Sequence, residues 1–256
     1  MSVLQPENCQ LKIICADTCD GGGKGTNTAR FRREFPTLYP DHILISAREP
    51  GSFLPADESD SPEISAGEEI RKLLASAKPD VQPMGLFTTF MSFFVARADL
   101  YRRIENMVKQ DKGRRFIALL DRSLASTYAY QVFASQGGDF IRTAFEHALA
   151  DLFDSLWRQV PGAEVHHLLI DVDDQEAARR RERRGEEEGA LLQFAESGFQ
   201  ELVMEGYRTF HEAVTAKMFQ HPNIPHTSVL LDGNGTPDEV YARFKAAAIS
   251  IIGTPA

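Results

Sequence analysis

A glycine-rich segment near the start of the chain has the composition of a phosphate-binding loop. The apolar run 13–16 is typical of a buried strand, and the glycines 21–23 and Lys24 follow it, before a polar segment. In the order strand, loop and helix, glycine N–H groups can point at phosphate oxygens, and the helix adds its positive N-terminal end. The segment therefore indicates a nucleotide-binding loop, with a glycine-rich turn of no chemical consequence as the alternative.

The loop departs from the common G-x-x-x-x-G-K-[ST] pattern at two positions. Thr18 stands where the pattern has its first glycine, and Gly25 stands where it has a hydroxyl side chain. The hydroxyl is moved to Thr26, an arrangement that resembles adenylate kinases, so Mg²⁺ ligation through Thr26 is an open expectation. The residues expected to bind nucleotide phosphates are Gly21, Gly22, Gly23, Lys24, Gly25 and Thr26.

Two further apolar runs end in residues that can bind a phosphate or a cation. Arg48 follows the run 42–46, within Arg48-Glu49-Pro50-Gly51, where the alternative is an incidental arginine in a surface turn. Asp121 and Arg122 follow the run 116–120. An aspartate at this point can hold Mg²⁺, and a guanidinium beside it can bind a phosphate through two hydrogen bonds. The alternative for this pair is a surface ion pair at the end of a strand.

Two helical patterns carry side chains with more than one interpretation. Phe93 and Arg97 are four residues apart in the segment 86–110, hence on one helix face, where ring and guanidinium could hold a planar base. The alternative is a core Phe93 with Arg97 extending into solvent. Five arginines within the six positions 179–184 are followed by three glutamates at 186–188. Such a run is usually a solvated face, but arginines on a movable flap can also stabilise a transferring phosphoryl group.

The chain alternates between apolar strand patterns and helical patterns. This alternation predicts a P-loop NTPase-type three-layer α/β/α fold with a five-stranded parallel sheet, right-handed crossovers and a small helical, arginine-rich lid. Ligands in such sheets bind outside the carboxyl ends of the strands, where the glycine-rich loop, Arg48 and Asp121 are expected. The expected strands are 12–16, 42–46, 116–120, 165–172 and 228–231; the expected helices are 26–34, 66–77, 86–110, 126–133, 138–159, 175–184, 195–216 and 237–252.

Length and composition are those of one domain with a large core. The chain has 256 residues, is 43% hydrophobic and carries a formal net charge of −9, which argues against non-specific binding to DNA or RNA. No run approaches the roughly 18 apolar residues of a membrane helix, residues 1–10 lack the apolar core of a signal peptide, and three cysteines suit unpaired thiols in a reducing cytosol. We expect an N-terminal extension at 1–10 and a single domain at 11–256, with an acidic loop insertion at about 52–66 and the lid at about 175–194.

Taken together, these motifs resemble the thymidylate kinase family, within the nucleoside monophosphate kinases. The resemblance extends over most of the chain, from about residue 11 to residue 252. In chain order, its motifs are Asp20-x-x-Gly23-Lys24, Arg48-Glu49-Pro50-Gly51, Gly67-Glu68-x-Ile70-Arg71, Phe93-x-x-x-Arg97-Ala98, Asp121-Arg122-x-x-x-Ser126-Thr127-x-Ala129-Tyr130-Gln131 and the arginine-rich run.

The resemblance implies an enzyme, a phosphotransferase that uses ATP with Mg²⁺ as its cofactor. Its partners would be ATP and a deoxynucleoside monophosphate, with dTMP as the leading acceptor and dTDP as the product. It also implies a cytoplasmic homodimer without a nucleic-acid or membrane partner. The alternatives are a kinase for another or a modified deoxynucleoside monophosphate, a deoxynucleoside kinase, and a non-catalytic nucleotide-binding regulatory protein.

The resemblance further implies roles for the matching residues. Lys24 would hold the ATP phosphates, and Asp20 would lie between donor and acceptor. Arg48 and Arg122 would clamp the acceptor monophosphate, and Asp121 would serve Mg²⁺. In the arginine-rich lid, Arg180 and Arg184 would reach the γ-phosphate. The acceptor base would stack on Phe93 and bond to Arg97, and the rest of the pocket would be lined by Ser126, Thr127, Tyr130 and Gln131.

Overall fold

The computed structural model describes residues 11–48, 51, 53–54, 67, 69–70, 85–111, 113–184 and 198–255, with the side chain of Arg184 left out. The expected extension 1–10, most of the insertion at 52–66 and the lid beyond residue 184 therefore lie outside the described residues. The same holds for Glu49, Pro50, Glu68 and Arg71, whereas Gly67, Glu69 and Ile70 are helical.

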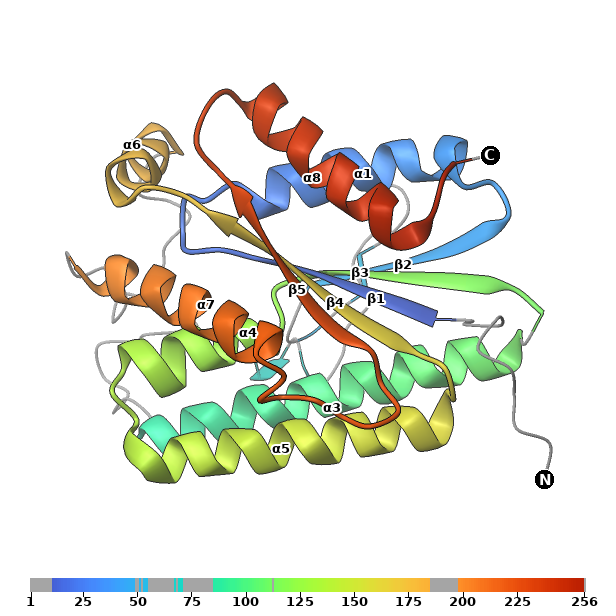
Figure 1. The fold of residues 1–256 in the computed structure, drawn as a ribbon, viewed down its shortest axis with the longest axis horizontal. Coiled ribbons are helices and arrows are strands. Elements are labelled where there is room, and N and C mark those ends of the chain that lie inside the picture. The colour runs from blue at the N-terminus through green and yellow to red at the C-terminus, as the bar shows by residue number, and fades with distance from the viewer. Residues whose placement is uncertain are drawn as a thin grey trace.

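A five-stranded, all-parallel sheet forms the middle layer of the described structure (Figure 1). Its strand order is β2-β3-β1-β4-β5, so β1 lies between β3 and β4, where the order along the sheet changes direction. The predicted parallel sheet is thus confirmed. The strands are β1 (Leu11–Asp17), β2 (His42–Arg48), β3 (Arg115–Asp121), β4 (Glu164–Asp171) and β5 (His226–Asp232).

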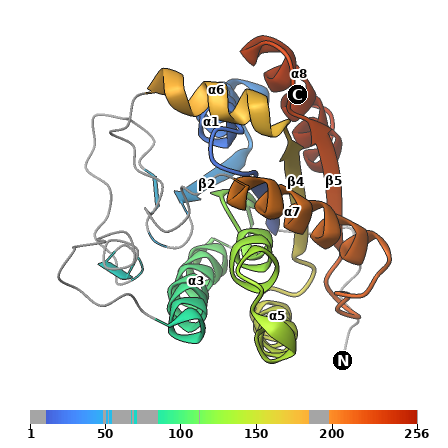
Figure 2. The same ribbon diagram turned by 90° about the vertical axis from the view of Figure 1, so that its left-hand side faces the viewer.

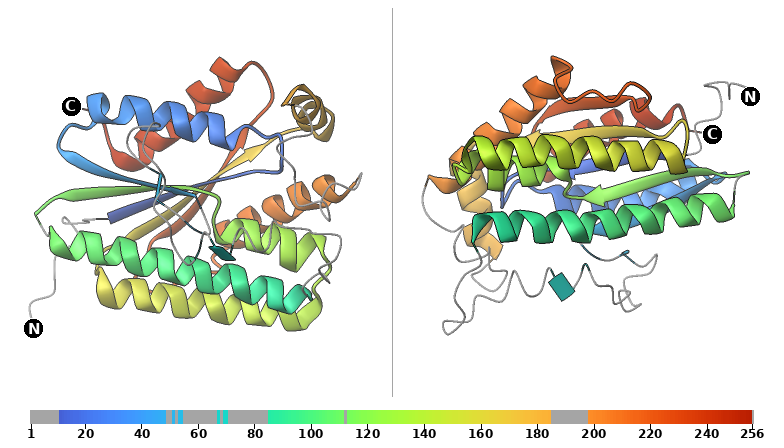
Figure 3. Two further views of the ribbon diagram at one scale, coloured as in Figure 1. Left: turned by 180° about the vertical axis from the view of Figure 1, so that it is seen from behind. Right: turned by 90° about the horizontal axis from the view of Figure 1, so that it is seen from below.

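Helices cover both faces of this sheet and complete the predicted three layers (Figure 1). One face carries α1 (Lys24–Leu38) and α8 (Pro237–Ile252). On the opposite face, α3 (Leu86–Gln110) and α5 (Gly138–Gln159) run side by side (Figure 3), together with α4 (Leu124–Thr127), η2 (Tyr128–Ala134) and α7 (Phe199–Thr215). No helix in the described ranges combines the length and the apolar composition needed to cross a bilayer.

The alternation of side chains along β1 divides the core into two parts. Ile13 and Cys15 belong to the core under α3, α5 and α7, whereas Ile14 and Ala16 belong to the core under α1 and α8. Successive side chains of a strand point to opposite faces, and a strand covered on both faces is apolar throughout. This explains why the apolar runs in the sequence predicted the strands of the sheet.

The segment after β3 differs from the single helix expected at 126–133. The short helix α4 begins there, with the Ser123 hydroxyl accepting a hydrogen bond from the Ala125 N–H, and continues as the π-helix η2. The wider turns are closed by bonds such as that from the Ser135 N–H to the Tyr130 carbonyl. Single π-turns inside helical segments are frequent at functional sites, and this one begins six residues after Arg122.

Strand register brings the expected site residues to one edge of the sheet. Ala16 of β1 and Arg48 of β2 both pair with Asp121 of β3. Figure 2 views the molecule from the side on which the strands end, and α6 (Asp174–Arg184) lies on this side. The carboxyl ends of β1, β2 and β3 therefore meet where a ligand is expected in such a sheet.

Candidate active site

The loop between β1 and α1 has the backbone geometry that its glycines predict. Gly21 and Gly23 have φ values of 92° and 90°, in the left-handed region that favours glycine. A Cβ atom on Gly21 would also collide with the Ala177 carbonyl of α6. The loop therefore depends on its glycines, and α6 packs directly against it.

The N-terminus of α1 is suited to an anion. Its N-cap, Gly23, makes no side-chain capping bond, and the first turn contains no acidic residue. Lys24 is the first residue of the helix and is half-buried. Burial and the Arg122 cation lower the pKa of Lys24, while Asp121 and Asp20 act in the opposite direction. Free N–H groups, the helix dipole and the lysine together form an anion-binding end.

Arg122 reaches from the end of β3 to the phosphate loop. Its Nη2 atom donates to Asp20 Oδ1 over 2.7 Å, and its guanidinium lies 5.4 Å from the centre of the Tyr130 ring. Although burial favours the neutral acid, Arg122 and Lys24 hold the pKa of Asp20 below its ordinary value. The two residues therefore form an ion pair that places the guanidinium beside the loop.

Asp121 lies between Arg48 and the start of α1. Its Oδ2 atom is 3.8 Å from Arg48 Nε, and its buried Oδ1 atom has no hydrogen-bond partner among the described residues. A Cβ atom on Gly25 would lie 3.9 Å from Asp121 Oδ2, whereas the Thr26 side chain is exposed. A buried carboxylate oxygen without a partner has the chemistry of a Mg²⁺ ligand, so Asp121 fits the expected cation.

The residues expected around the acceptor base lie beside this edge. Arg97 is 1% exposed and donates to Thr127 Oγ1 over 2.8 Å and to the Ser123 carbonyl over 2.9 Å. The alternative of an Arg97 that extends into solvent is therefore wrong. Phe93, one turn earlier in α3, is half-buried. The remaining expected pocket residues Ser126, Tyr130 and Gln131 are all buried.

The arginines of α6 contact two different loops. Arg180 pairs with Glu176 over 2.9 Å and donates to the Gly233 carbonyl over 3.0 Å, in the loop between β5 and α8. Arg181 donates to the Asp20 carbonyl over 2.6 Å, directly at the phosphate loop. Arg181 was not among the expected site residues, because the position of one arginine within such a run depends on how α6 meets the loop.

Comparisons with known proteins indicate which family has a sequence similar to this chain. No family model matches the chain. Curated thymidylate kinases are similar to it: that of Mycoplasma mobile is 24% identical over 196 residues, 76% of this chain and 81% of that protein. That of Mycoplasma capricolum subsp. capricolum is 26% identical over 230 residues, 90% of each chain. That of Mycoplasma genitalium is 25% identical over 174 residues, 68% of this chain and 69% of the other.

These similarities support a relationship between this chain and the thymidylate kinase family. The members of this family are phosphotransferase enzymes, and the expected enzyme class is confirmed at this level. In the described part of the chain, Asp20, Lys24, Arg48, Asp121 and Arg122 lie at one edge of the sheet within one electrostatic cluster. The lid is the exception, since the Arg184 side chain and the residues that follow it lie outside the described part of the chain.

Several residues of this cluster were not expected from the sequence. Asp17, the last residue of β1, is fully buried and bonds to Ser123 and Ser126. Tyr207 of α7 bonds to Ser126 over 2.7 Å, and Gln200 of α7 accepts from the Asp20 N–H over 3.1 Å. Asp17 could have been found, since an acid at the end of a buried strand must have partners; the α7 residues carry no local signal.

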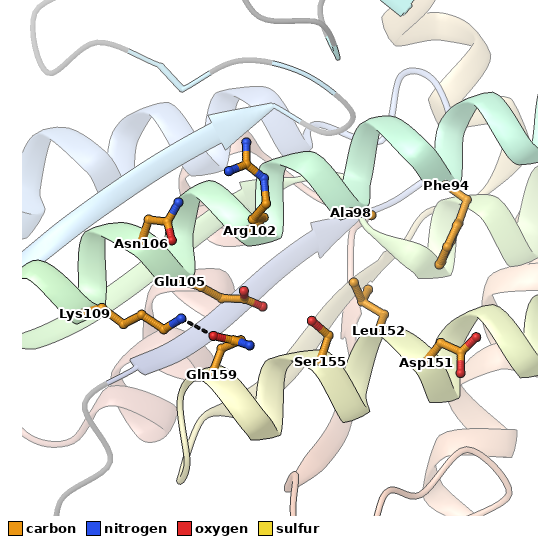
Figure 4. A pocket seen from close by; sticks show the side chains of 10 residues that line it. All are labelled: Phe94, Ala98, Arg102, Glu105, Asn106, Lys109, Asp151, Leu152, Ser155 and Gln159. Carbon is orange, nitrogen blue, oxygen red and sulfur yellow. Dashed lines mark hydrogen bonds between the residues drawn. The ribbon is translucent and has the colours of Figure 1, made fainter.

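A pocket of about 460 Å³ between α3 and α5 lies apart from this cluster (Figure 4). It includes none of the expected site residues, and a bond between Lys109 and Gln159 crosses it. Its wall contains Glu105, which is 4% exposed and whose pKa is raised by burial. Its lining is Phe94, Ala98, Arg102, Glu105, Asn106, Lys109, Asp151, Leu152, Ser155 and Gln159.

Proposed function

We propose that the protein is an ATP-dependent nucleoside monophosphate kinase that transfers the γ-phosphoryl group of ATP to dTMP. The observation that carries this proposal is Arg122, which faces the phosphate loop from the neighbouring strand and pairs with Asp20 at 2.7 Å. A donor-binding loop and an acceptor-binding cation are then side by side. The names of the similar curated proteins, each a thymidylate kinase, support dTMP as the acceptor.

The donor half of the site is the loop 21–26 with Lys24. Its backbone N–H groups and the Lys24 ammonium would bind the ATP phosphates, as the free N-terminal end of α1 favours. Arg180 and Arg181 lie on the side of α6 that touches this loop and the β5–α8 loop. We assign the γ-phosphate contacts to arginines of α6, with Arg184 as a further candidate.

The acceptor half lies across β1 from the donor half. Arg122 and Arg48 would bind the acceptor phosphate, which requires Arg122 to exchange Asp20 for the phosphate oxygens. Phe93 would stack on the base and Arg97 would bond to its edge. The remaining contacts would come from the buried residues Ser126, Thr127, Tyr130 and Gln131.

Charge compensation and positioning would supply the catalysis. The acceptor phosphate is already anionic near neutral pH, so transfer needs no strong general base. Lys24, Arg122 and the arginines of α6 would offset the charge that spreads over the transferring group. Asp121 would hold Mg²⁺, with Thr26 as a second candidate; the ion, when bound, neutralises phosphate charge and orients the donor.

The arginines also separate this proposal from its alternatives. A deoxynucleoside kinase has an uncharged acceptor, and two arginines at the acceptor side would then face no anion. A regulatory protein without transfer would need only the donor half. The conjunction of Arg48, Asp121 and Arg122 at 3.8 Å or less from their partners therefore favours a phosphorylated acceptor.

Replacement of Arg122 tests the proposal. Arg122→Ala should lower kcat/KM for dTMP by about 10²–10⁴-fold, because it removes a cation from the transferring phosphoryl group. A coupled assay of ADP release measures the change. The matched control is Arg158→Ala, which removes an exposed arginine paired with Asp154 on α5 and should stay within about twofold of the parent. Near-parental turnover of Arg122→Ala would contradict the proposal.

A further inference from the structure

A fully buried carboxylate lies directly beneath the two halves of the site. Asp17 is the last residue of β1 and is 0% exposed. Its Oδ1 atom accepts from the Ser123 N–H over 2.9 Å and from Ser126 Oγ over 2.6 Å. Its Oδ2 atom accepts from Ser123 Oγ over 2.5 Å. All three donors belong to the segment that follows β3, so Asp17 ties that segment to the end of β1.

This segment carries Arg122 in an unusual backbone conformation. Arg122 has a φ of 78°, which residues other than glycine adopt only where the surroundings hold them. Its N–H donates to the Ala16 carbonyl over 2.9 Å, and the next residue, Ser123, bonds to Asp17. The strained residue is therefore fixed on both sides by the last two residues of β1.

We propose that Asp17 is a positioning residue that holds Arg122 in the conformation in which its guanidinium faces the phosphate loop. Asp17 is fully buried and its bonds go to Ser123 and Ser126, so it would act through Arg122 and not by contact with substrate. The catalytic consequence rests on the proposed function. The conformational consequence does not, because it concerns only the bonds between Asp17 and Ser123, the residue that follows Arg122.

The hydrogen-bond pattern around Ser123 fits an ionised Asp17. The Ser123 hydroxyl donates its one proton to Asp17 and accepts from the Ala125 N–H over 3.0 Å. His167 Nδ1, at 3.1 Å, must then donate to Ser123 Oγ, which fixes the proton on Nδ1. Burial opposes ionisation, yet His167, with Nδ1 3.9 Å from Oδ2, and the bonds from Ser123 and Ser126 hold the pKa of Asp17 below its ordinary value.

The amide group of an asparagine could not reproduce this arrangement. Two donors converge on Oδ1 and a third on Oδ2, so an NH₂ group at either place would face a donor. Only one of the two atoms of the amide is an acceptor, and the opposite hydroxyl would have to rotate away. Asp17→Asn should therefore fold while loosening the segment, and Asp17→Ala should loosen it further.

Amide hydrogen exchange tests the conformational claim without any activity. In Asp17→Asn, the amides of residues 122–126 should exchange at least about tenfold faster than in the parent, and faster still in Asp17→Ala. The matched control is Glu105→Gln, which neutralises a buried carboxylate on α3 outside the site and should leave these amides unchanged. Unchanged exchange at 122–126 in Asp17→Asn would overturn the proposal.

A double-mutant cycle tests whether Asp17 acts through Arg122. Asp17→Asn should lower kcat for phosphoryl transfer about 10–100-fold while the KM for ATP stays within about threefold. In the Arg122→Ala background the same change should cost less than about twofold, because the group that Asp17 positions is absent.

Equal losses in both backgrounds would overturn the proposal in favour of a merely structural role. A parent protein that transfers phosphate to no nucleoside monophosphate would refute the proposed function. The exchange experiment would still decide whether Asp17 holds the Arg122 segment.

Discussion

Asp121 presents one carboxylate oxygen to Arg48 and keeps the other buried without a hydrogen-bond partner among the described residues. Such an oxygen is stabilised by a cation, and Gly25 lies close to the same carboxylate, since a Cβ atom on Gly25 would lie 3.9 Å from the other oxygen, Oδ2. In nucleotide-binding loops a serine or threonine at this position supplies a hydroxyl to Mg²⁺. Here the metal would depend on Asp121 to a greater degree than in loops with that hydroxyl.

A hydroxyl restored at this position should strengthen Mg²⁺ binding. Gly25 has an exposed, α-helical position with no positive φ, so Gly25→Ser introduces no backbone strain. The Mg²⁺ concentration for half-maximal transfer should fall several-fold, because the serine hydroxyl adds one oxygen ligand to the ion. Gly25→Ala, which adds a Cβ without a hydroxyl, is the control. An equal response of the two variants would refute a metal site between position 25 and Asp121.

Residue types at the strand ends could be predicted from the sequence, but their partners could not. Arg48, Asp121 and Arg122 were recognisable because they stand where apolar strand patterns end, and Lys24 because it follows the glycine-rich loop. The ion pair between Arg122 and Asp20 depends on a positive φ that no pattern indicates. Arg181, and not another arginine of the run, contacts the phosphate loop because of how α6 packs against that loop, and the two elements are far apart in the sequence.

The π-helix η2 owes its position to close packing against α7. Gly206 of α7 lies so near that a Cβ atom would approach Ala129 Cα to 2.8 Å and Phe133 Cβ to 3.0 Å. The buried ring of Tyr130 in η2 contacts the Tyr207 ring of α7, with centroids 6.5 Å apart. Because η2 also holds the cation–π partner of Arg122, packing between these helices determines where the site wall lies.

Gly206→Ala should therefore destabilise the protein although alanine is the better helix former. The propensity gain of about 1 kcal/mol is outweighed by the close approach to backbone atoms, for a net loss of about 1–2 kcal/mol in unfolding free energy. Chemical denaturation measures this loss. Gly113→Ala, whose Cβ atom would meet nothing within 4 Å, should change the unfolding free energy by less than about 0.5 kcal/mol. A stabilised Gly206→Ala variant would contradict the close packing.

Long amphipathic helices were predictable as elements, whereas η2 was not. The bounds 86–110 and 138–159 agree with α3 and α5 because each buries one periodic apolar face. The segment 126–133 has no signal for a π-turn, since its wider turns result from packing against Gly206 and Tyr207. Helix α1 extends to Leu38 beyond the expected end at 34, because Phe35 belongs to the core under α8.

Two buried histidines, His167 of β4 and His226 of β5, lie side by side in the sheet. His226 of β5 is 3% exposed, donates from Nδ1 to the Phe219 carbonyl over 3.0 Å, and lies with its ring centre 5.0 Å from that of His167. Burial and the neighbouring His167 lower the pKa of His226 to about 3. The folded protein therefore keeps His226 neutral at pH values where the unfolded chain would protonate it.

Acid should accordingly destabilise the whole molecule well above the range of its carboxylates. Between a pKa near 6.5 in the unfolded chain and about 3 in the folded one, the unfolded state binds the extra proton, so stability falls as the pH falls. The loss is at most about 1.4 kcal/mol per pH unit, and Asp17 and Asp20, with lowered pKa values, add their losses only at lower pH.

Thermal or urea unfolding between pH 7 and pH 4 measures this slope. His226→Gln should flatten the pH dependence, while replacement of the exposed His147 by glutamine should leave it as in the parent. A slope that His226→Gln does not change would assign the acid sensitivity to other groups.

At the scale of the whole molecule, the parallel sheet and its helical layers followed from the alternation of strands and helices. The strand order could not be predicted from this alternation, because it depends on which face of the sheet each connecting helix crosses. The place of β1 between β3 and β4 is what brings the phosphate loop beside Arg122.

The central claim is tested most directly by the products of phosphoryl transfer. The purified protein would be incubated with ATP and Mg²⁺ and, separately, with each deoxynucleoside monophosphate and with thymidine, and the products separated by anion-exchange chromatography. We predict that dTMP is converted to dTDP with one ADP formed per dTDP, and that thymidine is not phosphorylated. Transfer to no monophosphate, or to thymidine instead of dTMP, would contradict the account.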